Sequence, residues 1–113
     1  MIKALTVFSA ILLSTAAEAR GFNCGRYQCQ LSGITHCGPL ALALEWARHF
    51  PRTSAHPGAV VVQRRNGRAL GGGPGGHVSR IVSMQGTCRA VVKDERGTYE
   101  RDICSRLVAY VEP

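Results

Sequence analysis

The chain has 113 residues, and its 14 lysines and arginines outnumber its 7 aspartates and glutamates, which gives a formal net charge of +7. A chain of this length suits one domain with a modest hydrophobic core rather than several domains. The positive charge favours polyanionic partners such as anionic cell-envelope polymers, while the few aromatic residues, spread rather than interleaved with arginines, disfavour specific nucleic-acid binding.

Residues 1–19 predict a secretory signal peptide. One lysine precedes an apolar run at 4–13, and small residues end at Ala19. The apolar run is shorter than the roughly 20 residues that a membrane-spanning helix needs, so a retained anchor is the less favoured alternative. We therefore expect residues 20–113 to form a single secreted or periplasmic domain, with no stable membrane insertion after signal cleavage.

Two helices are predicted after the signal peptide. The first covers 24–31, where Asn23 is available as an N-cap. The second covers 39–50 (PLALALEWARHF) and has the strongest helical pattern in the chain, because proline suits a first helical position and Leu, Ala, Glu and Arg favour the rest. Between them, the polar and glycine-bearing segment 32–38 predicts a turn, and Pro51 ends the second helix.

The remaining segments are rich in β-branched residues and predict strands. The expected strands are 59–63, 77–84, 88–93, a short one at 98–101, and 107–111. The basic and then glycine-rich stretch 64–76 predicts an exposed loop, and 85–87 predicts a hairpin turn. Two helices followed by four or five strands predict an α+β domain, with the helices packed on a small antiparallel sheet.

All five cysteines follow the predicted signal peptide, and export permits disulfides. Because five is odd, one thiol stays free or pairs between chains. Cys88 and Cys104 flank the predicted hairpin, and Cys29 and Cys37 flank a short turn, so these pairings would leave Cys24 free; other connectivities stay open. No closely spaced Cys or His pairs suggest a metal site, and we expect no cofactor.

Three residues could supply nucleophilic chemistry: Cys24, His77 and Asp94. Cys24 opens the first predicted helix, whose first turn is expected to lower the pKa of the thiol. His77 begins a strand directly after the glycine-rich segment and could take the thiol proton, then protonate a leaving amine. Antiparallel pairing about the turn at 85–87 brings His77 close to Asp94, which would orient the ring; Glu95 is the fallback acceptor.

Each of these residues also has a purely structural interpretation. Cys24 could be half of a disulfide, and His77 could be an ordinary surface histidine at the start of a strand. Asp94 and Glu95 could be the polar corner of a hairpin. The sequence pattern by itself does not choose between these interpretations and a catalytic one.

Two segments resemble a known superfamily. Residues 57–62 (PGAVVV) followed by 76–82 (GHVSRIV) resemble the core strands of NlpC-type and CHAP-type domains, which are papain-like cysteine peptidases and amidases that cut peptidoglycan peptides. The resemblance covers about 23–111 and implies a minimal papain-like fold. The chain departs from the family pattern at Ala59, where an acid is usual, and at Arg80, which interrupts the strand.

Within this resemblance, Cys24 is the nucleophile, His77 the base and Asp94 the residue that orients it. A second register is open, because 37–43 (CGPLALA) resembles the cysteine segment of the double-glycine leader peptidases, another papain-like group. In that register Cys37 would be the nucleophile and Gln30 would lie near the oxyanion, while His77 and Asp94 keep their roles. We prefer Cys24.

The sequence therefore predicts a secreted cysteine hydrolase that cleaves amide bonds, with peptidoglycan peptide as the expected substrate. Its arginine-rich surface would hold it on peptidoglycan or another anionic cell-envelope polymer. The alternative is a non-catalytic, disulfide-stapled basic module that binds the same polymers. A free, reactive thiol at Cys24 would distinguish the enzyme from the module.

Overall fold

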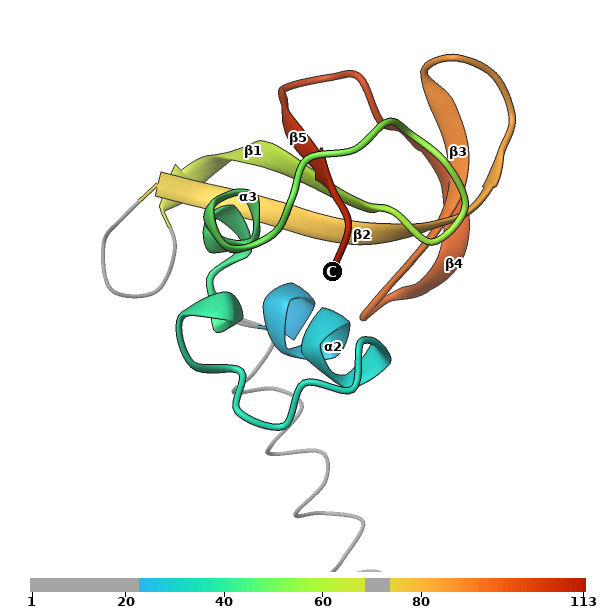
Figure 1. Ribbon diagram of the computed structural model, residues 1–113. Helices are drawn as coiled ribbons and strands as arrows, with labels where there is room; N and C mark the ends of the chain where they lie inside the picture. The colour runs from blue at the N-terminus through green and yellow to red at the C-terminus, as the bar shows by residue number, and fades with distance from the viewer. Residues whose placement is uncertain (1–22, 69–73) are drawn as a thin grey trace, which may run out of the picture.

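A computed structural model describes residues 23–68 and 74–113, and the segment predicted as a signal peptide lies outside them. The domain is α+β, as predicted, with a layer of short helical segments below a five-stranded antiparallel sheet (Figure 1). In the part of the chain that is described, no helix is long and apolar enough to cross a membrane.

The helical layer comes first in the chain and the sheet follows. The helical segments are α2 (Asn23–Leu31), the 3₁₀ turns η1 (Gly38–Ala41) and η2 (Ala43–Glu45), and α3 (Trp46–His49). The strands are β1 (Val60–Arg68), β2 (Pro74–Met84), β3 (Arg89–Asp94), β4 (Gly97–Asp102) and β5 (Leu107–Val111). The last four predicted strands are confirmed as β2 to β5, and β5 matches its prediction residue for residue.

The sheet has the strand order β4-β3-β2-β1-β5, with every neighbouring pair antiparallel. β2 is the central strand, and the valine run of β1 is also inside the sheet, because β1 pairs with β2 on one side and with the edge strand β5 on the other. In the β1–β2 register, Val62 lies opposite Val78 and Gln63 lies opposite His77. The β2–β3 pairing runs only as far as Arg80 opposite Lys93, so His77 lies beyond the last paired residues of β3.

The two faces of the sheet carry separate apolar clusters because strand side chains alternate between faces. Val60 and Val62 face the helical layer, where Trp46 of α3 is the largest fully buried side chain. Val61 faces the other way and packs with Ile81. The His77–Asp94 pair described below lies on the Val61 face, at one end of that second cluster, whereas Cys24 belongs to the cluster on the helical side.

The predicted helix at 39–50 is the main error in the fold prediction. The segment is instead three short helical pieces, interrupted at Leu42, whose backbone is extended (φ −90°, ψ 121°). The carbonyl of Leu40 accepts a 2.7 Å hydrogen bond from the Trp46 indole instead of continuing a helix. The same carbonyl lies so close to Gly25 that a Cβ there would meet it at 2.3 Å. Tertiary contacts therefore override a strong local helix propensity.

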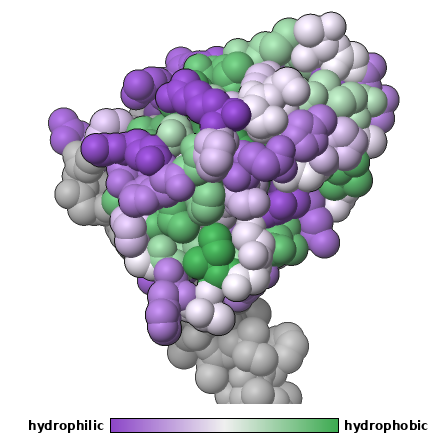
Figure 2. Space-filling model, viewed as in Figure 1, coloured by the Kyte–Doolittle hydropathy of each residue, from purple (hydrophilic) through white to green (hydrophobic). Residues whose placement is uncertain are grey.

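The predicted loop at 64–76 is also wrong over most of its described length. β1 continues to Arg68 and β2 already begins at Pro74, because antiparallel pairing satisfies the backbone polar groups of this exposed arm. Residues 69–73 lie outside the described part. The arm carries three exposed arginines, Arg64, Arg65 and Arg68. Figure 2 shows strongly hydrophilic side chains gathered on this side of the molecule.

Both predicted disulfides form. Cys29 is bonded to Cys37, and Cys88 is bonded to Cys104. Cys24 is the free cysteine and is buried. The two bonds are compatible with an exported protein, because oxidising compartments are where structural disulfides persist.

Candidate functional site

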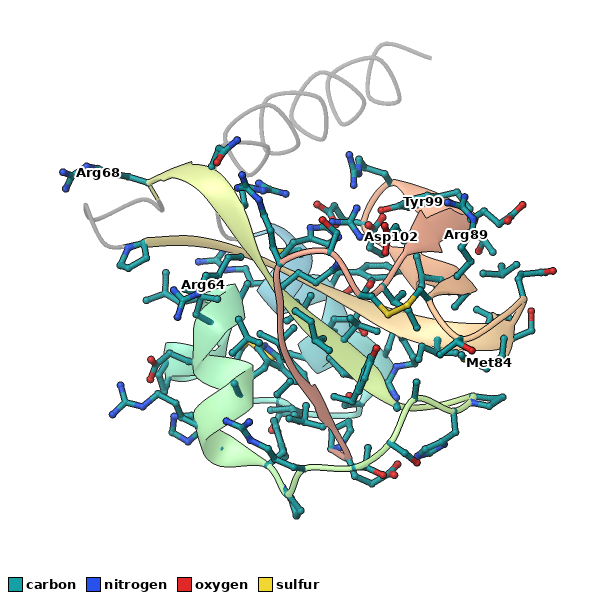
Figure 3. All side chains as sticks on the ribbon, turned by 90° about the horizontal axis from the view of Figure 1, so that it is seen from above. Arg64, Arg68, Met84, Arg89, Tyr99 and Asp102 are labelled. Carbon is teal, nitrogen blue, oxygen red and sulfur yellow. A yellow bond between two sulfur atoms is a disulfide. The ribbon has the colours of Figure 1, made fainter. Side chains whose placement is uncertain are left out.

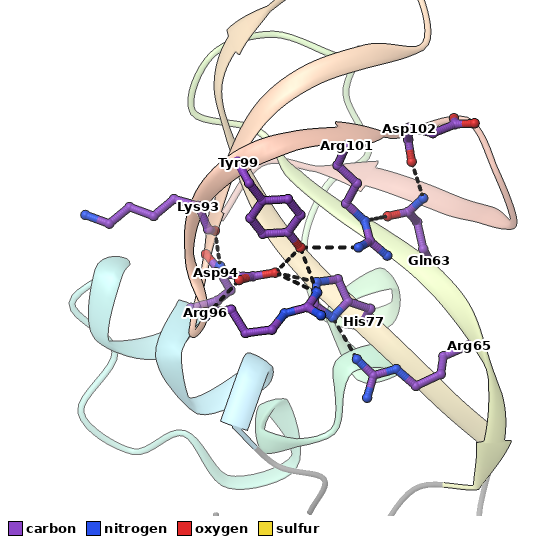
Figure 4. Close-up of polar contacts among 10 residues, drawn as sticks. Gln63, Arg65, His77, Lys93, Asp94, Arg96, Tyr99, Arg101 and Asp102 are labelled. Atoms are coloured by element: carbon purple, nitrogen blue, oxygen red, sulfur yellow. Dashed lines mark hydrogen bonds and ion pairs between the residues drawn. The ribbon is translucent and has the colours of Figure 1, made fainter. Parts of the chain in front are cut away.

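A buried histidine–aspartate pair forms the centre of the site. His77 is on β2 and Asp94 is the last residue of β3, and the spacing around the hairpin had predicted that they meet. His77 Nε2 lies 2.8 Å from Asp94 Oδ2, and each residue is only 1% exposed (Figure 4). Such a hydrogen bond fixes the orientation of an imidazole ring.

Asp94 is held as a carboxylate by several donors. The Tyr99 hydroxyl donates to Oδ2, and the backbone N–H of Arg96 donates to Oδ1 at 2.9 Å. The Arg96 guanidinium lies 3.5 Å from the same carboxylate. Burial alone would raise the pKa of Asp94, but the hydrogen bonds from His77, Tyr99 and Arg96 outweigh burial and hold the pKa well below its ordinary value.

The second ring nitrogen of His77 is also engaged. Arg65 Nη2 lies 3.1 Å from His77 Nδ1. Because a guanidinium has no acceptor, Nδ1 must accept this hydrogen bond, and the ring proton must sit on Nε2, where it is donated to Asp94. Burial lowers the pKa of His77, against the effect of Asp94. The ring is therefore neutral at physiological pH, in the tautomer that leaves Nδ1 basic.

Cys24 lies in the first turn of α2, next to the strand that carries His77. The backbone N–H of Val78, the residue after His77, interacts with the Cys24 sulfur. Cys24 is 3% exposed. Burial raises the pKa of the thiol, and this effect exceeds the opposing effects of the Val78 and Gly25 N–H groups. The expectation of a lowered thiol pKa is therefore wrong, because desolvation of the thiolate outweighs the helix start.

The structure thus brings Cys24 to the backbone beside His77 but does not join the two side chains. Over residues 23–68 and 74–113, no hydrogen bond links the Cys24 sulfur to the imidazole, whose two nitrogens bond to Asp94 and Arg65. A thiol proton can reach Nδ1 only after Arg65 releases it. In the resting arrangement, both the thiol and the imidazole are uncharged.

The competing nucleophile, Cys37, is excluded in this oxidised fold. Its sulfur is bonded to Cys29, so it carries no thiol. Gln30, the proposed oxyanion residue of that register, is exposed on α2. The fallback acceptor, Glu95, lies near the site, and its carboxylate is within 4.8 Å of ligand atoms of His77 and Asp94. These three residues are the one described group that could hold a cation, although the guanidinium groups of Arg65 and Arg96 lie against it.

A second layer of polar side chains holds this end of the sheet together. Gln63, opposite His77, donates to the backbone carbonyls of Asp102 at 2.9 Å and Ser105 at 2.8 Å. Its Oε1 accepts from Arg101 Nε at 2.8 Å, and Arg101 Nη1 lies 3.2 Å from the Tyr99 hydroxyl (Figure 4). These hydrogen bonds hold the end of β4 and the β4–β5 connection against β1, beside His77.

One contact positions α2 against the site. Gln28, fully buried, donates from Nε2 to the Lys93 carbonyl at 2.9 Å, one residue before Asp94. Its Oε1 has no hydrogen-bond partner among the described residues. The helix that carries Cys24 is therefore anchored to the strand that carries Asp94.

Sequence reasoning missed Arg65, Tyr99 and Arg101. Arg65 follows Gln63 by two residues, so it emerges on the same face of β1 as Gln63, but the prediction placed it in a loop. Tyr99 and Arg101 share a face of β4 by the same alternation. The alternation was visible in the sequence, but which face points to His77 depends on strand order and on the curl of the sheet.

Comparison of the chain with known protein families, with curated protein sequences and with solved structures finds no match. The class of molecule is therefore given by the fold and the site: a small, disulfide-bonded α+β domain with a five-stranded antiparallel sheet and a buried His–Asp pair beside a free thiol.

Proposed function

We propose that the protein is an exported cysteine hydrolase that cleaves amide bonds, with Cys24 as the nucleophile, His77 as base and acid, and Asp94 as the residue that orients the ring. One observation carries the proposal. The single unbridged cysteine stands at a helix start against the residue that follows His77, and that histidine has a buried carboxylate partner. These are the parts of a thiol–imidazole–carboxylate site.

The first half of the reaction follows from the tautomer. Nδ1 of His77 takes the proton of the Cys24 thiol, and the sulfur attacks the carbonyl carbon of the substrate. Asp94 stabilises the imidazolium that results, because its depressed pKa keeps it charged. The backbone N–H of Cys24 supplies one donor to the oxyanion. A neutral resting pair makes this a base-assisted attack rather than an attack by a preformed thiolate.

The second half returns the protons. The imidazolium gives its Nδ1 proton to the leaving amine, the C–N bond breaks, and a thioester to Cys24 remains. Water then attacks the thioester while His77 takes its proton, and the thiol is regenerated with release of the acid. Peptidoglycan peptide is the proposed substrate, because the exposed arginines of the β1–β2 arm favour an anionic envelope polymer.

Hydrolysis of peptidoglycan peptides by the oxidised domain, residues 20–113, tests the proposal. We expect Cys24→Ala to abolish release of new amines, and His77→Asn to lower kcat by a factor of about 10²–10⁴. His56→Asn is the matched control, because His56 is half-buried and pairs with Glu112 instead of Asp94. Equal rates for the wild type and Cys24→Ala would refute the proposal.

The second candidate function is the non-catalytic basic module. It is favoured by the exposed arginines of β1 and by the engagement of both His77 nitrogens in the resting structure. It predicts that Cys24→Ala and His77→Asn bind insoluble peptidoglycan as well as the wild type does. It also predicts binding that weakens steeply with salt, with no new amines released at any salt concentration.

A further inference from the structure

The cations around His77 are incompletely neutralised. Arg96 pairs with Asp94, but Arg65 and Arg101 form no ion pair with a carboxylate in the described part of the chain. Arg65 bonds to the neutral His77, and Arg101 bonds to the neutral Gln63 and Tyr99. A guanidinium prefers a carboxylate to a neutral acceptor, because a charge-assisted bidentate pair is stronger and geometrically matched.

Arg65 differs from Arg101 in being exposed and in having, among the described residues, one side-chain partner instead of two. The side chain lies on the exposed part of β1, whereas Arg101 is half-buried and joined to two neighbours. Arg65 is also within electrostatic range of the Cys24 sulfur, where it opposes the rise of the thiol pKa. One exposed cation therefore contacts the nitrogen that must accept the proton and acts electrostatically on the sulfur that must release it.

We propose that Arg65 is a carboxylate-recognition residue that gates this site: a carboxylate on the substrate, near the scissile amide, draws the Arg65 guanidinium from His77 Nδ1 and so frees the base. The inference rests on the proposed function and names its substrate class, amides that carry a nearby carboxylate. A neutral substrate leaves Arg65 on the ring and reacts slowly. An acidic one binds and opens the site in the same step.

The gate and a simple electrostatic role make opposite predictions for Arg65→Gln. If Arg65 only stabilises the thiolate, its loss raises the thiol pKa further and slows the reaction of Cys24 with a neutral reagent. If Arg65 blocks Nδ1, its loss frees the base and speeds that reaction. Preference for an anionic reagent falls in the gate case because the carboxylate has lost its partner.

Alkylation of Cys24 by iodoacetate and by iodoacetamide separates these cases. The two reagents are near-isosteric, and only iodoacetate carries a carboxylate. In each reaction the thiol proton passes to His77 Nδ1, sulfur bonds to the methylene carbon, and iodide leaves with the C–I electron pair. The ring then loses its proton to solvent. Rates are followed by mass spectrometry of the oxidised domain, in which Cys24 is the free thiol.

Arg64→Gln is the matched control. It removes the same charge from the adjacent position of β1, but its side chain emerges on the opposite face of the strand. Figure 3 shows Arg68 at the tip of the β1–β2 arm, far from Tyr99, so that a further variant, Arg68→Gln, tests net charge at a distance from the site. Neither control is expected to change the ratio of the two alkylation rates by more than about 1.5-fold.

We expect Arg65→Gln to lower the iodoacetate-to-iodoacetamide rate ratio about fivefold, the size of an exposed ion pair, and to raise the iodoacetamide rate itself. Arg65→Lys keeps the positive charge but loses the bidentate guanidinium group, so it should retain part of the wild-type preference for iodoacetate. A ratio equal to that of Arg64→Gln, or a slower iodoacetamide reaction, overturns the gate while leaving the hydrolase proposal intact.

The proposed function fails separately. If iodoacetamide reacts with His77→Asn as fast as with the wild type, His77 is not the base of Cys24. If Cys24 reacts with neither reagent until the protein is unfolded, the thiol is structural. Either result overturns the hydrolase and, with it, the gate.

Discussion

One face of the sheet has two halves that are equally buried but chemically opposite. In the apolar half, Val61, Ile81 and Val92 are at most 1% exposed. In the polar half, Gln63, His77 and Asp94 lie two or four residues away on the same strands and are at most 2% exposed. A chain that needed only a core would continue the aliphatic pattern, because aliphatic side chains need no partners.

The polar half is the part of the sheet whose burial is energetically unfavourable unless its groups are hydrogen-bonded. Burying a carboxylate is unfavourable unless donors surround it, and Asp94 has donors from His77, Tyr99 and Arg96. Conflicts of this kind between stability and local chemistry concentrate at functional sites. Substitutions in the apolar half should therefore change mainly the stability of the domain, and substitutions in the polar half mainly the reactivity of the site.

The largest expected loss of stability is in the apolar half. Ile81→Ala removes a fully buried side chain from the cluster around Val61, and we expect the free energy of unfolding to fall by about 3.5 kcal/mol. Ile81→Val should cost about 1 kcal/mol. Urea denaturation measures both. The rate of Cys24 alkylation under native conditions should stay within about twofold of the wild type for Ile81→Val, since His77 is untouched.

Gly25→Ala should come next, and it tests the helical layer rather than the sheet. A Cβ at this position would meet the carbonyl oxygens of Leu40 at 2.3 Å and Ala41 at 2.4 Å, and both are backbone atoms. We expect a loss of about 2 kcal/mol in urea denaturation. Gly86→Ala is the control, because a Cβ there meets nothing within 4 Å. Equal stabilities for the two variants would contradict the close approach of η1 to α2.

Asp94→Asn should lower the stability of the domain less, but it should lower the rate of amide hydrolysis much more. The amide keeps the shape of the carboxylate and part of its hydrogen bonding, so we expect a loss of about 1.5 kcal/mol in the free energy of unfolding. It removes the charge that supports an imidazolium, so amide hydrolysis should fall by roughly 10²–10⁴. Glu100→Gln is the control, since Glu100 is exposed and pairs with Arg89 rather than with His77. A variant with full activity would show that Asp94 is only structural.

The smallest expected effect is a pH dependence of stability that belongs to His77. Its folded pKa lies below the ordinary value of 6.5. As the pH is lowered below 6.5, the unfolded chain therefore takes up a proton that the folded chain does not. The free energy of unfolding consequently decreases as the pH decreases. Asp94, whose folded pKa is below its ordinary 3.8, adds a further loss below that value.

Urea midpoints for the wild type and His77→Gln between pH 7.5 and 5 check this dependence. The variant should show the shallower decline. His56, whose pKa is raised by the Pro57 carbonyl and by Glu112, acts in the opposite direction in both proteins and cancels in the comparison. Parallel curves would mean that His77 titrates alike in the folded and unfolded chains.

Features set by short-range spacing were predictable from the sequence. The turn at 85–87 fixed which strands pair, and this pairing brought His77 to Asp94. Both disulfides close local loops, with separations of 8 and 16 residues. The last strand followed directly from its β-branched residues.

Features set by long-range contacts were not predictable. The 39–50 helix is broken by the bond from Trp46 to Leu40 and by the approach to Gly25, which no local propensity encodes. The pKa of Cys24 rises because of burial, which is a property of the whole fold. Arg65 reaches His77 only because β1 continues past the point where the glycine-rich pattern suggested a loop.

The placement of the two cystines has a consequence for access to the buried sulfur. One closes a loop inside the helical layer and the other closes a loop at the β3–β4 edge, so neither cross-links the layers. Side-chain links across the seam include Gln28 to Lys93 and Arg80 to Ser32. Separation of the helical layer from the strands would therefore break no covalent cross-link, and amide hydrogen exchange at Val78 would measure how often such opening occurs.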